Sequence, residues 1–266
     1  MTYKTIWLSD LHLGTRGADA AGALAFLRQH ESETLYLVGG IVDFWHLRRD
    51  RYWPQAHNDV LQKILRKARK GTRVVYLPGN HDEFSAQFLG VYGNVIVKEH
   101  ELYTSVRGQR LLVIHGHQFD MVTKHARWMA LLGDAGYSLL LRLNRPLNAL
   151  RGRYGLSHWS LSAYVKSRVK SAVNFVSQFE DAVVHFAELH RADGIVCGHI
   201  HTPTIKQIRH ITYYNCGDWV ESHTAMVEHA DGRIELWPGP PNESALPMDA
   251  DSGTGVSPVR SEISGE

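Results

Sequence analysis

The sequence predicts an α/β protein in which layered, mixed β-sheets are flanked by helices and carry a helical insertion. Short apolar runs rich in β-branched residues recur along the chain, helical patterns separate the early runs, and polar motifs follow the runs directly. With 266 residues, of which 44% are hydrophobic, the chain is long enough to bury one substantial core.

Five apolar runs are the expected central strands, and each ends where a polar motif begins. They lie at residues 5–8, 34–38, 73–77, 110–114 and 194–197. Helical patterns at 20–30 and 55–70 separate the first three runs, which is typical of alternating strands and helices. Further strand-like segments lie at 212–215, 224–228 and 233–237. Open α/β sheets place ligand sites beyond the carboxyl ends of their strands, so we expect the polar motifs to meet at one edge.

The composition predicts one main domain, residues 1–237, with a helical insert or lid at about 120–190 and a disordered tail at 238–266. The tail is rich in Pro, Gly, Ser and acids and has few large apolar residues. Within the insert, the apolar run 137–143 is too short to cross a bilayer and is closely flanked by arginine.

The beginning of the chain and its cysteines indicate a cytoplasmic protein. The first polar motif starts at Asp10, which leaves no room for a signal peptide. The two cysteines, Cys197 and Cys216, are too few for a disulfide framework, and we expect both to be buried, reduced thiols.

The charge is small overall, +2, but it is unevenly distributed. Residues 121–170 contain nine lysines and arginines and a single acid, Asp134. Such a block predicts an anionic partner: a phosphorylated substrate, an anionic membrane surface or, as the interpretation we least expect, a nucleic acid. Lys166, Arg168 and Lys170 are the candidate phosphate contacts, and the alternative is that they form an ordinary solvated helix face.

Five polar motifs follow the five expected strands. They are Ser9-Asp10-Leu11-His12, Gly39-Gly40-Ile41-Val42-Asp43, Gly79-Asn80-His81-Asp82, His115-Gly116-His117 and Gly198-His199-Ile200-His201. Each alone could be a polar strand end or a turn. Together they offer the carboxylate, imidazole and amide-oxygen ligands that suit Mn, Fe or Zn better than Mg or Ca. Two such ions about 3.5–4 Å apart polarise phosphoryl oxygens and ionise a water near neutral pH.

In this order the motifs resemble the calcineurin-like metallophosphoesterase superfamily, whose pattern is Asp-x-His, Gly-Asp-x-x-Asp, Gly-Asn-His-Asp/Glu, His and Gly-His-x-His. Segments 39–45, 77–82, 115–120, 159–164 and 217–222 are more narrowly similar to UDP-2,3-diacylglucosamine diphosphatases and their paralogues. The resemblance spans about residues 4–237. It implies a layered metallophosphoesterase sandwich with two divalent ions, Mn in the first place and Fe or Zn as alternatives.

The resemblance also implies which residues bind metal. Asp10, His12 and His201 would hold one ion, and Asn80, His115 and His199 the other. An aspartate should bridge the two ions, but Gly40 stands at its position. Three interpretations remain open: the change removes activity, another acid or a water forms the bridge, or the protein works with one metal.

Two further residues are the candidate catalytic pair. The resemblance implies that Asp43 accepts a hydrogen bond from His81 and orients its ring, so that His81 can protonate the leaving oxygen. The alternative is that His81 only holds the turn around Asn80. We expect Phe44 and Trp45 to pack near this pair.

The function implied by the resemblance is metal-dependent hydrolysis of UDP-2,3-diacylglucosamine to UMP and lipid X in lipid A biosynthesis. An apolar insert with a basic face suits such an amphiphile and predicts a cytoplasmic protein peripheral on the inner membrane. One alternative is a phosphodiesterase acting on cyclic or other small nucleotides, which has little use for an apolar lid. The other is a non-catalytic scaffold of the same fold, for which Gly40 is the supporting feature. The sequence leaves the oligomeric state open.

Overall fold

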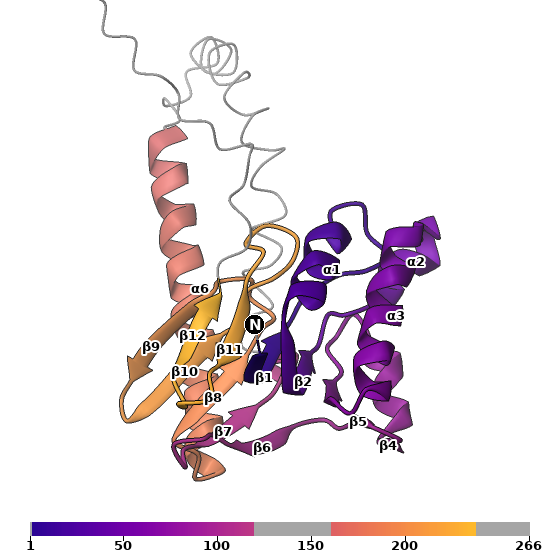
Figure 1. The fold of residues 1–266 in the computed structure, drawn as a ribbon. Coiled ribbons are helices and arrows are strands. Elements are labelled where there is room, and N and C mark those ends of the chain that lie inside the picture. Colours follow the sequence, from indigo (N-terminus) through magenta and orange to yellow (C-terminus); the bar gives the residue numbers. More distant parts are fainter. Residues whose placement is uncertain (1, 120–160, 238–266) are drawn as a thin grey trace, which may run out of the picture.

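The computed structural model describes residues 2–119 and 161–237, the latter with side chains from residue 175 onward. The described residues form two mixed sheets with helices on their outer faces, which confirms the predicted α/β class (Figure 1).

The larger sheet has seven strands in the order β12-β11-β1-β2-β3-β5-β4. Their bounds are β1 Thr2–Leu8, β2 Glu31–Val38, β3 Arg73–Leu77, β4 Gly90–Tyr92, β5 Val95–Val97, β11 Ala225–Glu228 and β12 Ile234–Trp237. Strands β1, β2, β3 and β5 run parallel, while β4, β11 and β12 pair antiparallel with their neighbours. The loops after β1, β2 and β3 therefore leave the sheet at the same edge.

The smaller sheet has five strands in the order β6-β7-β8-β10-β9. They are β6 Glu101–Thr104, β7 Arg110–Val113, β8 Gly194–Cys197, β9 Thr204–Ile208 and β10 Ile211–Asn215. Strands β7, β8 and β10 are parallel, whereas β6 and β9 pair antiparallel at the two edges. The loops after β7 and β8 again leave at one common edge.

Helices cover the outer face of each sheet. They are α1 Ala20–Gln29, α2 Phe44–Asp50, α3 Gln55–Arg69 and α6 Leu161–Leu189, with short 3₁₀ turns at Glu83–Phe88 and His117–Phe119. Figure 1 shows α1, α2 and α3 together on the side of the larger sheet and α6 beside the smaller one. Among the described residues, none of these helices has the length and apolar character needed to cross a membrane.

Three apolar cores bind these layers together. The first lies between the larger sheet and α1 and α3, around Phe26, Leu35 and Val60. The second lies between the two sheets, where residues such as Trp7 and Val113 meet, and the third packs α6 onto the smaller sheet. Burial of apolar surface is the main favourable term in folding, so the sheets are held face to face by the middle core.

The predicted strands and helices are confirmed within a few residues at their ends. The structure adds strands β4, β5, β6 and β9 and helix α2, which the apolar pattern did not indicate. Helix α6 lies within the insert predicted at about 120–190 and is helical as expected, while residues 120–160 of that predicted insert and the predicted tail 238–266 lie outside the described residues. Cys197 and Cys216 are buried free thiols, as predicted.

Candidate active site

The residues predicted to bind metal follow strands of both sheets. Asp10, His12 and Asn80 follow β1 and β3 of the larger sheet, and His115, His199 and His201 follow β7 and β8 of the smaller one. Parallel strands of one sheet end at the same edge, and the structure brings the two edges together, so these residues meet although they are far apart in the chain.

Asp10, His12 and His201 form one compact group. Oδ1 of Asp10 lies 3.4 Å from Nε2 of His12 and 3.4 Å from Nε2 of His201, and the two Nε2 atoms are 3.3 Å apart. A tetrahedron whose corners lie about 2.0–2.1 Å from its centre, the length of a zinc–imidazole bond, has edges of about 3.3 Å. These three ligand atoms therefore fit a single four-coordinate divalent ion.

Asn80, His115 and His199 form the second group. Nε2 of His115 lies 3.3 Å from Oδ1 of Asn80, and the His115 and His199 rings are 5.0 Å apart between centroids. Nδ1 of His115 is 2.9 Å from the carbonyl oxygen of Val38, so this nitrogen carries the proton and Nε2 keeps its lone pair for a metal. Burial lowers the pKa of His115 to about 3, which keeps the ring neutral.

Asp43 joins two histidines. Its Oδ2 lies 2.8 Å from Nδ1 of His81 and 3.3 Å from Nδ1 of His12, while its Oδ1 accepts a hydrogen bond from the His46 amide and caps α2. Burial raises the pKa of Asp43, but the hydrogen bonds from His12, His81 and the His46 amide outweigh burial and place it well below its usual range. The Trp45 ring lies 4.8 Å from that of His81, as expected from the sequence.

The charges around His12 and Asp10 reinforce one another. Burial lowers the pKa of His12, but the carboxylates of Asp10 and Asp43 on either side outweigh it and raise this pKa to about 9. Burial raises the pKa of Asp10, but the His12 and His201 rings beside its Oδ1 outweigh burial, so this pKa lies well below its usual range. Without a metal, His12 is therefore a cation between two carboxylates.

Four of the grouped residues adopt the left-handed backbone conformation. The φ angle is +52° at Asp10, +45° at His12, +71° at His199 and +52° at His201. This conformation costs a residue with a Cβ roughly 1–2 kcal/mol, and residues under such strain are common at functional sites. Hydrogen bonds hold it here: the amides of Asp10 and His12 donate to the carbonyls of Gly39 and Gly40 at 3.0 and 2.7 Å.

Gly40 faces this centre. Its φ is +63°, and a Cβ added to it would lie 2.5 Å from Oδ1 of Asp10. A side chain at position 40 would thus point toward the first group, which is where the resemblance places a bridging aspartate. The glycine leaves that place without a carboxylate.

Asp82 is an important residue that the sequence analysis did not single out. Its buried carboxylate accepts hydrogen bonds from the amides of Gly79 and Ile41 and from the Tyr76 hydroxyl, the last two at 2.8 and 2.6 Å. It therefore fastens the loop that carries Asn80 to the loop that carries Gly40. Its place at the end of Gly79-Asn80-His81-Asp82 was the available signal, but the sequence does not show which amides an acid will meet.

The candidate phosphate contacts Lys166, Arg168 and Lys170 lie in the first half of α6. Their side chains are outside the described residues, as is the run 137–143, so their predicted role stays a prediction.

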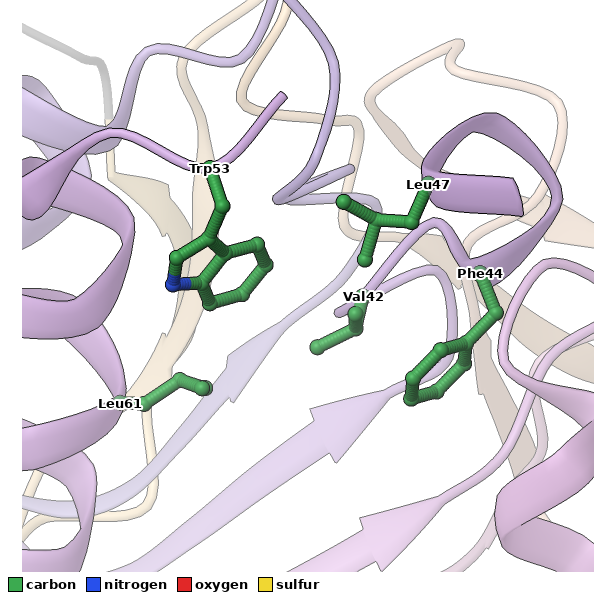
Figure 2. Close-up of a pocket in the computed structure, with 5 residues that line it drawn as sticks. All are labelled: Val42, Phe44, Leu47, Trp53 and Leu61. Atoms are coloured by element: carbon green, nitrogen blue, oxygen red, sulfur yellow. The ribbon is translucent and has the colours of Figure 1, made fainter. Parts of the chain in front are cut away.

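An apolar groove of about 420 Å³ lies behind the loop that carries Asp43. Figure 2 shows Val42, Phe44 and Leu47 on one side, facing Trp53 and Leu61 of the segment that leads into and along α3. Val42 and Phe44 line the groove, whereas Asp43 between them turns to the histidines. This groove therefore borders the candidate active site but does not contain the ligand groups.

Comparisons with known proteins show the family and the relatives of this chain. The model of the calcineurin-like phosphoesterase family matches residues 3–203. The chain is 26% identical to the UDP-2,3-diacylglucosamine hydrolase of Photorhabdus laumondii over 216 residues, which are 77% of this chain and 84% of that protein. It is 25% identical to the Shewanella halifaxensis enzyme of the same name over 242 residues, 88% of this chain and 97% of that protein.

The solved structures that this chain matches include Yfce, a phosphoesterase from E. coli. It is 17% identical to this chain, with a TM-score of 0.43 and coverage of 89% of this chain and 99% of that one.

Proposed function

Because this chain belongs to the calcineurin-like phosphoesterase family, whose members are metal-dependent hydrolases, we propose that it hydrolyses the pyrophosphate of UDP-2,3-diacylglucosamine or of a closely similar nucleotide lipid. The products would be UMP and a lipid phosphate. The observation that carries this proposal is the meeting of two ligand groups with the Asp43–His81 pair at one edge of the two sheets.

Divalent ions, with Mn as our first candidate, would supply the Lewis acid that polarises the phosphoryl oxygens and makes a water nucleophilic. Asp10, His12 and His201 would hold one ion, and Asn80, His115 and His199 would hold another. Their imidazole, carboxylate and amide donors suit ions of the Mn, Fe and Zn type.

His81 is the proposed general acid. Its Nδ1 is 2.8 Å from Oδ2 of Asp43, so the Asp43 carboxylate accepts the Nδ1 proton and stabilises positive charge on the ring. Nε2 is then left to face the substrate. As the water oxygen bonds to phosphorus it gives up a proton to solvent, the bond to the leaving oxygen breaks, and the Nε2 proton of His81 passes to that oxygen. Asp43 acts through His81 and is a positioning residue.

Apolar surface beside this pair supports an amphiphilic substrate over a small nucleotide. Trp45, which packs on His81, is 49% exposed, and Trp53 in the neighbouring groove is 37% exposed. Exposed aromatic side chains flanking a hollow are typical of sites for apolar ligands. We assign the groove to the acyl part of the substrate, and we assign the basic first half of α6 to its phosphates or to an anionic membrane surface.

The test is hydrolysis of three substrates with added Mn²⁺: the nucleotide lipid, bis(p-nitrophenyl) phosphate and cyclic AMP. We expect the lipid to have the highest kcat/KM, with UMP as a product, and we expect His81→Gln to lose most of this activity. The matched control is His46→Ala, because His46 is a partly exposed histidine of α2 whose amide, not its ring, contacts Asp43. Preferential hydrolysis of cyclic AMP would favour the small-nucleotide alternative, and no hydrolysis of any substrate would favour the scaffold.

A further inference from the structure

The two ligand groups differ in charge, and this difference suggests how the metals bind. In the first group a carboxylate oxygen of Asp10 lies beside the ring nitrogens of His12 and His201. A divalent ion held by one carboxylate and two imidazoles is partly neutralised, so this group can keep an ion without further help.

The second group contains only neutral donors. Asn80 offers an amide oxygen, and His115 and His199 offer imidazoles. Among the side chains that the structure describes, the clusters of three acidic, histidine or cysteine ligands are Asp10 with His12 and His201, and His12 with Asp43 and His81. Neither cluster includes His115 or His199, so none of the described side chains gives a second ion a carboxylate of its own.

The neighbouring acids are already engaged. Oδ2 of Asp10 accepts a hydrogen bond from the His199 amide at 2.8 Å. Asp43 is shared among His12, His81 and the His46 amide, and Asp82 accepts bonds from the two ligand loops and Tyr76. Moving any of these carboxylates to a second ion would leave buried donors without partners, which is unfavourable.

Position 40 is a place beside this centre from which a side chain could supply an anion. Gly40 faces Oδ1 of Asp10 and carries no side chain. Two divalent ions about 3.5–4 Å apart repel each other strongly, because the energy grows as the product of their charges divided by distance. An anion between them is needed to offset this repulsion.

We propose that one divalent ion resides at Asp10, His12 and His201, and that a second ion binds at Asn80, His115 and His199 only together with a phosphate anion, which takes the place that Gly40 leaves empty. The inference rests on the proposed phosphoesterase centre. It makes the phosphoryl group of the substrate a partner in assembling the centre as well as the target of hydrolysis.

Metal stoichiometry tests this directly, without turnover. The protein is dialysed against Mn²⁺ alone and against Mn²⁺ with inorganic phosphate, and bound Mn is measured by mass spectrometry and by electron paramagnetic resonance. We expect one Mn per chain without phosphate, and two with phosphate together with the signal of a coupled Mn pair. The affinity for the second ion should rise about tenfold or more with phosphate, and by linkage Mn²⁺ should raise the affinity for phosphate by the same factor.

Two substitutions sharpen the test. Asn80→Asp is isosteric and adds the missing carboxylate, so it should bind two Mn without phosphate, while Asn80→Ala should hold one Mn under both conditions. Gly40→Asp should also bind two ions, although its Cβ must displace the Asp10 carboxylate and its backbone is left-handed. Asn80→Asp avoids both difficulties, so the inference does not depend on whether Gly40→Asp folds.

Three results would overturn the inference: two Mn bound to the unaltered chain without phosphate, one Mn with phosphate, or no Mn at all. These readouts are independent of substrate choice. A chain that shows phosphate-dependent binding of the second Mn but does not hydrolyse the nucleotide lipid would keep this inference and refute the proposed substrate.

Discussion

Nδ1 of His81 lies 2.8 Å from Oδ2 of Asp43, and the other oxygen of the same carboxylate caps helix α2. One acid thus fixes both a candidate proton donor and the helix beside it. An asparagine at this position can still cap the helix but cannot carry the negative charge that stabilises a protonated His81.

We therefore expect Asp43→Asn to fold normally and to lower kcat for the nucleotide lipid by about 10²-fold, the lower range of general acid catalysis. The loss should be much smaller for bis(p-nitrophenyl) phosphate, because p-nitrophenolate leaves without protonation. Steady-state kinetics on both substrates checks this. Equal losses on the two substrates would show that Asp43 serves the metal centre and not the leaving group.

Metal binding should release protons. The pKa of His12 is raised to about 9 in the metal-free protein, and only the neutral ring can bind a metal, so protons compete with the ion. Mn²⁺ affinity should therefore increase between pH 7 and 9 and level off above 9. Titration calorimetry in buffers of different ionisation enthalpy measures the released proton. Affinity that is constant over this range would contradict the charge assigned to His12.

Asp82→Asn should destabilise the protein and weaken metal binding together. The amide group of asparagine would face backbone donors that now meet a carboxylate, and hydrogen bonds to charged groups contribute about 1.5–3 kcal/mol. Tyr76→Phe is the matched control, because it removes one hydrogen bond to the same carboxylate and leaves the two loops joined. Urea unfolding and Mn titration of both variants distinguish the two roles. Loss of stability without loss of Mn affinity would limit Asp82 to a structural role.

His57 should make stability fall in mild acid. Burial lowers the pKa of His57, whose Nδ1 accepts a hydrogen bond from the Gly14 amide at 3.0 Å. In the unfolded chain His57 takes up a proton below about pH 6.5, whereas in the folded chain burial opposes this protonation. The stability that the neutral, buried His57 contributes is therefore present above that pH and is lost as the pH falls. His57→Gln should lose less stability than the unaltered chain between pH 7.5 and 5.5 by urea unfolding. Histidines with a raised pKa change stability with pH in the opposite direction, but they do so in both chains. The difference in stability between the two chains therefore reports His57 alone.

Trp53→Ser should raise KM for the nucleotide lipid several-fold and leave kinetics on bis(p-nitrophenyl) phosphate unchanged. The indole forms one wall of the apolar groove, and this small substrate has no acyl chain to place there. Leu189→Ser at the end of α6, also an exposed apolar residue, is the control and should affect neither substrate. A rise in KM for both substrates would indicate that Trp53 supports the loop around Asp43 instead.

The sequence allowed the fold and most candidate residues to be predicted, because β-branched runs and the motifs behind them are local signals. Asp10 and Asn80 were predicted as ligands because each follows a recognisable strand and belongs to a recognisable motif. The apolar groove was not predicted, because Trp53 and Leu61 face Val42 only after α2 and α3 have packed. The bonds of Asp82 and the left-handed backbone at Asp10 likewise depend on the neighbouring loops, which the pattern of a single strand does not contain.

The distribution of ligands over the two sheets has a consequence for the order of folding. His12 and His201 are 189 positions apart, and they meet only when both sheets have formed and docked. Closing so long a loop comes late, so a metal cannot serve as a nucleus for the folding chain. Mn²⁺ should therefore leave the refolding rate unchanged and slow unfolding alone, because it stabilises the folded state and not the transition state for folding.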